Sequence, residues 1–202
     1  MTAKKGARGA AAIAERIVEE EDAAQIADFG KQLGDEKETG ATKAARVLGE
    51  VATRKPEAVV PLVDRFVQGL TSPHKRVVQT SAEALPAIAK IAPARVAKHL
   101  DKLKDAYPAA TAIGKDGVVR TFSTLCSASV AYQKRLEPVL KTALGEAEPK
   151  TLVAWAKDVL PALKGEPHAN ARAVVEDRLR TIPKPQAQEI ADFLGIRLRH
   201  RG

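Results

Sequence analysis

A segment of eight residues recurs along this chain at a nearly constant spacing, and this recurrence limits the fold to a row of similar units. Residues 45–52 (ARVLGEVA) are followed by Pro56, and 37 positions later residues 82–89 (AEALPAIA) are followed by Pro93. Further shifts of 40 and 35 residues continue the pattern. One position of the unit is held by Leu48, Leu85, Leu125 and Leu160, and another by Val63, Leu100, Leu140 and Val175. Such a period predicts a repeat architecture.

The apolar residues within each unit fall at i, i+3, i+4 and i+7, which is the spacing of one helix face. No segment shows the sustained alternation of a strand. Prolines at 56, 73, 93, 149, 167 and 185 each precede a periodic segment and suit first helical turns. Ser72 is placed to cap the helix that Pro73 begins. Breaks are predicted at Gly114-Lys115-Asp116-Gly117, Gly145 and Gly165.

Four helix pairs are therefore expected between a leading helix and a short closing helix. We predict the pairs 41–54 with 57–69, 74–91 with 94–106, 117–131 with 134–145, and 150–164 with 168–181. The leading helix is predicted over about 10–33, with the acidic run Glu19-Glu20-Glu21-Asp22 as a solvated face in mid-helix rather than a cap. We divide the chain into an N-terminal arm and acidic helix (1–39) that can cap the first repeat, a repeat domain (40–196) closed by a helix over about 186–195, and a frayed basic tail (197–202).

Two first helices carry a proline near their end. Pro86 and Pro161 occupy equivalent places, and Gly49 and Cys126 fill that place in the other two units. Helix-loop-helix units of this length with a late proline resemble HEAT repeats, or the related armadillo and HEAT-like units, over residues 41–181. The resemblance implies an all-α fold of the α–α superhelix class that binds other macromolecules along successive helices.

The charge of the chain is unevenly distributed. Residues 1–39 have a net charge of −3 and residues 40–202 a net charge of +11, which together give +8. A basic body favours an anionic partner, and solubility alone explains the same charge. No apolar run approaches the ~18 residues of a membrane span, and the run 10–14 is too short for a signal peptide. With one cysteine, the chain is predicted to be soluble and cytoplasmic.

The second helix of each pair is the predicted binding element, because second helices usually line the concave face of such arrays. Basic residues there would form a positive stripe that neutralises phosphates. Acidic residues share these helices, so a solvated face is the competing interpretation. The candidate binding residues are Arg65, Lys98, Lys102, Lys104, Arg135, Lys141, Arg172, Arg178 and Arg180.

No grouping of residues points to catalysis, and we expect neither a metal nor a cofactor. The four histidines lack neighbours at metal-ligand spacing, and His74 and His168 are interpreted as exposed or capping residues. Cys126 has no identifiable base and is interpreted as a small buried residue. Gly6-Ala7-Arg8-Gly9 lacks the features of a phosphate loop and is interpreted as a flexible arm.

Three functions remain open from the sequence. The first is a non-catalytic scaffold that binds a protein through its second helices. The second is a sequence-tolerant DNA- or RNA-binding protein that uses the basic stripe. The third, an enzyme resembling DNA glycosylases, rests on Trp155 and Asp158, although Trp155 is better explained as a core or interface anchor.

Overall fold

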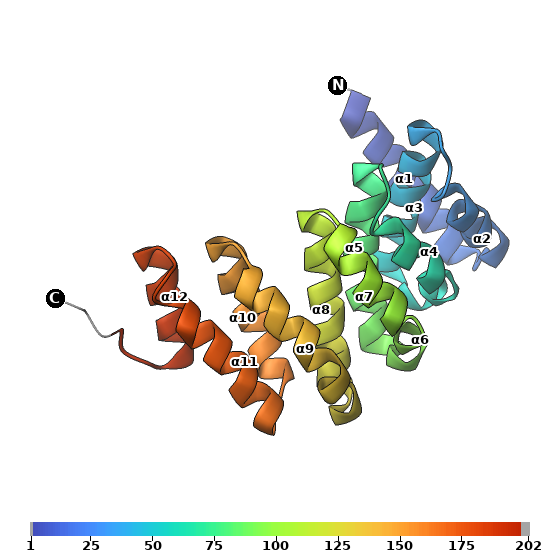
Figure 1. Cartoon of the computed structure of the whole chain (residues 1–202). Helices are drawn as coiled ribbons and strands as arrows, with labels where there is room; N and C mark the ends of the chain where they lie inside the picture. Colours follow the sequence, from blue (N-terminus) through green and yellow to red (C-terminus); the bar gives the residue numbers. More distant parts are fainter. Residues whose placement is uncertain (1, 199–202) are drawn as a thin grey trace. The chain divides into compact units, whose positions relative to one another are not determined.

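The structure is a computed structural model that describes residues 2–198, with side chains from residue 8 onward. Over this range all regular structure is helical, which confirms the predicted all-α, helical-repeat class (Figure 1). The chain forms two compact units, an N-terminal unit of residues 1–121 and a C-terminal unit of residues 122–202. None of the described helices combines the length and the apolar character needed to cross a membrane.

The N-terminal unit is built from helix pairs stacked in two layers. The first-helix layer is formed by α1, α3 and α5, which pack in that order, and the start of α8 packs against α5. The second-helix layer contains α2, η1, α4, α6 and α7. The elements are α1 (Thr2–Glu19), α2 (Ala23–Gln32), α3 (Glu38–Arg54), the 3-10 helix η1 (Pro56–Leu62), α4 (Val63–Gly69), α5 (Lys75–Ile91), α6 (Pro93–Ala97), α7 (Leu100–Ala109) and the start of α8 (Ala112–Ala128).

The predicted leading helix over 10–33 is in fact two helices. The chain breaks at Glu21, which has the positive φ of 52°, and Asp22 caps α2 by accepting a hydrogen bond from the backbone N–H of Gln25 at 2.9 Å. The interpretation of the acidic run as a mid-helix face is therefore wrong, because its last carboxylate satisfies a helix N-terminus. The expected flexible arm at Gly6-Ala7-Arg8-Gly9 lies within α1.

Helices α1 and α2 form a further helix pair that the sequence interpretation missed. Both pack against α3. The buried residues Ile26, Phe29 and Leu33 precede Val63, Phe66 and Leu70 by the same 37 positions that separate the next two units. The first 39 residues therefore belong to the helix stack of the N-terminal unit.

The predicted second helices 57–69 and 94–106 are each divided. The first is η1 followed by α4, with Pro61 inside η1. The second is α6 followed by α7, with the division at Lys98, which stands 37 positions after Pro61. In the first pair, Pro61 explains the division because a proline cannot donate a backbone hydrogen bond. The second pair is divided at the equivalent position although no proline stands there.

Two local predictions at first-helix starts need correction. Helix α5 begins at Lys75, and Ser72 caps the preceding turn instead, since its hydroxyl accepts from the backbone N–H of His74 at 3.2 Å. Helix α8 begins at Ala112, so Gly114 and Gly117 lie inside it rather than in a break. A Cβ at Gly117 would lie 2.5 Å from the Cα of Ala82, so glycine there permits close helix packing.

The C-terminal unit contains the end of α8, α9 (Val130–Glu146), α10 (Pro149–Ala162), α11 (Gly165–Arg178) and α12 (Lys184–Leu194). The predicted closing helix is confirmed as α12, which packs on α10. Its buried residues Ala187, Ile190 and Ala191 follow Leu152, Trp155 and Ala156 by 35 positions, so α12 takes the place of another first helix. Of the predicted basic tail, residues 199–202 lie outside the described residues.

Candidate binding surface of the second helices

The nine predicted basic residues fall into two groups, one in each unit. Residues Arg65, Lys98, Lys102 and Lys104 belong to the second-helix layer of the N-terminal unit. Residues Arg135, Lys141, Arg172, Arg178 and Arg180 belong to α9, α11 and the turn after α11 in the C-terminal unit.

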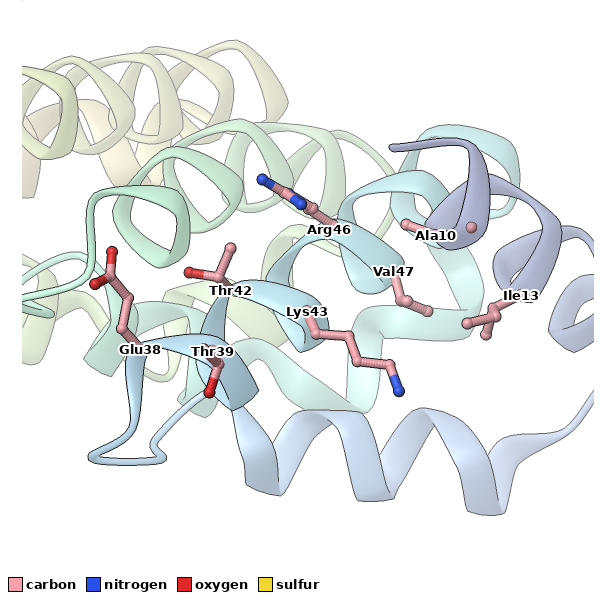
Figure 2. A pocket seen from close by; sticks show the side chains of 9 residues that line it. Ala10, Ile13, Glu38, Thr39, Thr42, Lys43, Arg46 and Val47 are labelled. Carbon is pink, nitrogen blue, oxygen red and sulfur yellow. The ribbon is translucent and has the colours of Figure 1, made fainter. Parts of the chain in front are cut away.

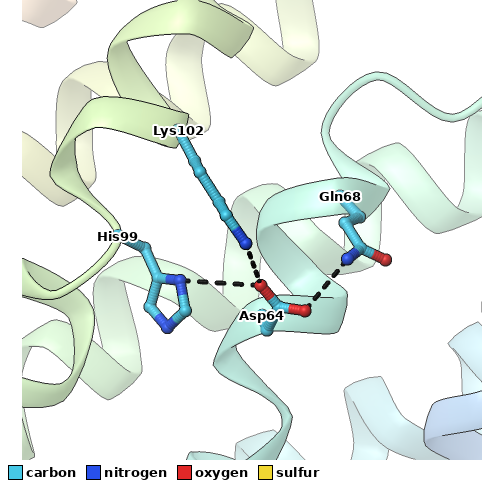
Figure 3. Close-up of polar contacts among 4 residues, drawn as sticks. All are labelled: Asp64, Gln68, His99 and Lys102. Atoms are coloured by element: carbon cyan, nitrogen blue, oxygen red, sulfur yellow. Dashed lines mark hydrogen bonds and ion pairs between the residues drawn. The ribbon is translucent and has the colours of Figure 1, made fainter.

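In the N-terminal unit, Asp64 organises the polar side chains between α4 and α7 (Figure 3). Its Oδ1 lies 2.7 Å from the Nζ of Lys102 and 3.6 Å from the Nδ1 of His99. Its Oδ2 accepts a hydrogen bond from the Nε2 of Gln68 at 2.9 Å. The hydrogen bond from Lys102 is the main reason that the pKa of Asp64 is lowered; partial burial opposes this effect, and the charges of Lys102, His99 and Arg65 support it.

A pocket of about 430 Å³ adjoins this network on the side of the loops. Gln68 and Arg65 reach it from α4, and the Nε2 of His74 lies 3.2 Å from the backbone oxygen of Asp35, which links the two loops of its wall. The lining residues are Leu33, Gly34, Asp35, Glu36, Arg65, Gln68, Gly69, Ser72, Pro73 and His74. A pocket lined by amide, guanidinium and carboxylate groups suits a polar ligand segment rather than an apolar one.

Arg178 stabilises the fold of the C-terminal unit. Its guanidinium donates to the backbone oxygens of Leu144 at 3.3 Å and Ala147 at 2.8 Å, and to that of Gly145. These carbonyls lie at the end of α9, where a cation offsets the helix dipole. The predicted role of Arg178 in partner binding is therefore less suited to its position than a structural one.

Besides Lys102, three of the predicted residues form ion pairs. Lys141 pairs with Glu137 at 3.4 Å, and Arg172 pairs with Glu176 at 2.7 Å. Exposed Arg180 lies 3.9 Å from Asp177. Within the described part of the chain, no ion pair engages Arg65, Lys98 and Lys104. The N-terminal unit therefore offers the more available cations.

The surplus of positive charge does not lie on the second helices. Those of the N-terminal unit, with the Lys98–His99 link, carry six basic and five acidic residues, and α9 and α11 carry five of each. The first helices α3, α5, α8 and α10 carry ten basic and five acidic residues. The second-helix surface is thus of mixed charge, which favours hydrogen bonding over simple attraction of a polyanion.

The residues that the sequence suggested for catalysis or metal binding have mainly structural roles. Cys126 is buried, as predicted, and burial raises the pKa of its thiol to about 12, so the nucleophilic thiolate is disfavoured. Trp155 is 4% exposed and is a core residue, whereas Asp158 is exposed. The Nδ1 of His168 lies 2.9 Å from the backbone oxygen of Leu160. Among the described residues no group of three or more metal-binding side chains is found.

Gln68 and Asp64 were not among the predicted site residues. The signal that points to them is their spacing of four residues, which brings the two side chains together on one helix face. The pairing of Asp64 with Lys102 depends on the packing of successive units and is not visible in either helix alone.

Comparisons with known proteins extend the description of the fold. No family model and no curated protein matches the sequence. Among solved structures, the chain is similar to the crystal structure of an engineered protein, a target of the Northeast Structural Genomics Consortium. The TM-score is 0.66 at 20% identity, with 97% of this chain and 90% of that chain covered. At this identity the likeness concerns the fold alone.

Proposed function

We propose that this chain is a non-catalytic helical-repeat scaffold that binds a protein partner through its second helices. In the N-terminal unit the bound element is an extended peptide segment that lies on α4 and enters the adjoining pocket. The observation that carries this proposal is the Asp64 network, which fixes Gln68 at the pocket and leaves Arg65 available beside it.

The hydrogen-bonding capacity of these two side chains matches a peptide. Asp64 accepts from the amide nitrogen of Gln68, so the amide oxygen and a second N–H remain for a backbone N–H and C=O of the partner. The guanidinium of Arg65 presents donors for a carboxylate or carbonyl group. Because Asp64 already holds the amide in place, binding requires little further ordering of that side chain.

The mixed charge of the second helices supports a protein rather than a nucleic acid. A polyphosphate would meet Asp64, Asp101 and Asp105 together with the lysines of α7. A peptide, in contrast, presents both donors and acceptors. A nucleic-acid-binding function would instead produce affinity that falls steeply with salt.

Site-specific photo-crosslinking tests the location of the partner. A photoreactive amino acid is introduced at Lys98 in the second-helix layer or at Lys90 on α5, and crosslinked partners from native lysate are identified and purified. We expect a protein to be captured from position 98 and not from position 90. Recovery of nucleic acid without protein, with binding that falls between about 50 and about 300 mM salt, would contradict the proposal.

Affinity measurements with the purified partner then test the residues. Gln68→Ala and Arg65→Glu are expected to weaken binding at least about tenfold, through loss of hydrogen bonds at the pocket. Gln188→Ala is the matched control, because Gln188 donates to Asp192 at 2.8 Å with the same four-residue spacing in the C-terminal unit. Equal effects of Gln68→Ala and Gln188→Ala would show that the pocket is not the binding site.

A further inference from the structure

A second concave site lies at the opposite layer of the N-terminal unit, between α1 and α3 (Figure 2). It is a groove of about 500 Å³, within the range of about 300 to about 1,000 Å³ that small-molecule sites occupy. Its lining residues are Gly9, Ala10, Ile13, Glu38, Thr39, Thr42, Lys43, Arg46 and Val47. None of them belongs to the pocket beside α4.

The groove is lined by residues that differ in kind from those at the equivalent place between α3 and α5. At the α3–α5 junction, buried Thr80 donates its hydroxyl hydrogen to the backbone oxygen of Ala45 at 3.0 Å. The residue 37 positions earlier is Lys43, whose exposed side chain cannot fill the same space. Opposite it, α1 presents Gly9, and a Cβ built there would meet no atom within 4 Å. A long exposed cation and a glycine thus leave the space between the two helices unfilled.

The groove is chemically divided. Ala10 and Val47 are buried and form an apolar floor with Ile13. Figure 2 shows Lys43 and Arg46 extending from α3 in different directions, and within the described residues neither side chain forms an ion pair. The hydroxyl groups of Thr39 and Thr42 lie along the same helix.

The charges of the lining favour an anion. Lys43 and Arg46 outnumber the one acidic lining residue, Glu38, which lies at the start of α3 with its carboxylate directed away from them. Two cations without partners beside an apolar floor can bind an anionic head group while the floor covers an apolar body. An uncharged apolar ligand would use the floor and leave both cations without a counter-ion.

We propose that the groove between α1 and α3 binds a small amphiphilic anion, an apolar body that carries a carboxylate or sulfonate. The apolar body lies against Ala10, Ile13 and Val47, and the flexible side chains of Lys43 and Arg46 turn toward the anionic head to bind it. This site is independent of the peptide site proposed on α4.

Fluorescence titration of the full chain with 1-anilinonaphthalene-8-sulfonate tests the proposal, with decanoate as the competitor. We expect saturable binding that decanoate displaces. Gly9→Leu places a side chain in the groove, and Arg46→Glu reverses the charge at its rim, so each is expected to weaken binding at least about tenfold. Arg54→Glu, an equal charge reversal at an exposed position of α3 outside the groove, should leave binding unchanged.

Circular dichroism melting of every variant separates loss of the site from loss of the fold. Binding by folded Gly9→Leu and Arg46→Glu that equals the unsubstituted chain would overturn the location of the site. Displacement by uncharged decanol as effective as that by decanoate would overturn the anionic class of the ligand. Binding of an acidic peptide at this groove, with no binding of either small anion, would also refute the proposal.

Discussion

Gln133 is the buried polar residue that most clearly fixes the C-terminal unit. It is 2% exposed. Its Nε2 donates to the backbone oxygens of Cys126 at 3.0 Å and Ala162 at 3.1 Å, and its Oε1 accepts from the backbone N–H of Lys164 at 3.0 Å. Both carbonyls lie at helix ends, where no residue of the same helix can bond them. One side chain thus connects α8, α9 and the end of α10.

Gln133→Met should lower the free energy of unfolding by about 3 kcal/mol. Three hydrogen bonds are lost, and each contributes about 1 kcal/mol net. The backbone groups of Cys126, Ala162 and Lys164 are left without this partner, so about 3 kcal/mol is a lower limit. Methionine has a similar length, so no large cavity adds to the effect. About 3 kcal/mol is a large part of the ~5–15 kcal/mol that stabilises a typical domain.

Urea unfolding followed by tryptophan fluorescence measures this effect in the correct unit. Trp155 is the one tryptophan of the chain and is buried in the C-terminal unit, so its emission reports the unfolding of that unit. The matched control is Gln188→Met, because Gln188 is exposed and is expected to cost less than about 0.5 kcal/mol. A loss below about 1 kcal/mol for Gln133→Met, or a loss equal to that of the control, would refute the assigned role.

Two further predictions concern the N-terminal unit. Gly117→Ala should destabilise this unit by about 1 to 3 kcal/mol, because the new Cβ would meet Ala82 at 2.5 Å. Gly9→Ala is the control and should stabilise α1 by up to about 1 kcal/mol, because alanine favours helices and its Cβ would meet no atom within 4 Å. Equal melting temperatures of the two variants would contradict this prediction. The lowered pKa of Asp64 stabilises the fold above the ordinary carboxyl pKa, and this contribution is lost as pH falls through the lower folded value. Lys102→Met should therefore weaken the acid dependence of unfolding between about pH 5 and about pH 2, and an unchanged profile would argue against the pair.

The repeat period was sufficient to predict the class of fold and most of the helices. The α1–α2 pair was missed because its first helix contributes the small buried residue Ala14 where the next two units have Val51 and Ile88. Ile26 and Phe29 do match the next unit at an offset of 37, and an alignment of second helices alone would have found them. The break at Glu21 was hidden because glutamate favours helices, so a run of acidic residues looks helical.

Glycine was the other source of error. Gly114 and Gly117 were interpreted as a break, which is the more frequent meaning of paired glycines. In the structure they lie inside α8, and a Cβ at Gly114 would come within 2.8 Å of the backbone oxygen of Leu70. A glycine that permits close helix packing cannot be recognised from its neighbours in the sequence, because the packing contact is with residues far away along the chain. The candidate site could not be predicted for the same reason, because Asp64 and Lys102 come together only when neighbouring units pack.

The pairing of Lys102 with Asp64 also bears on which partner the second helices can bind. A phosphate bound by Lys102 would lie close to the carboxylate of Asp64, which is 2.7 Å from the same Nζ and would repel the phosphate. A peptide that bonds to Gln68 and Arg65 leaves the 2.7 Å ion pair intact and uses the order that it provides. A polyanion therefore meets a repulsion at this surface that a peptide avoids. For this surface, the arrangement of charges is a better guide to the partner than the net charge of +8.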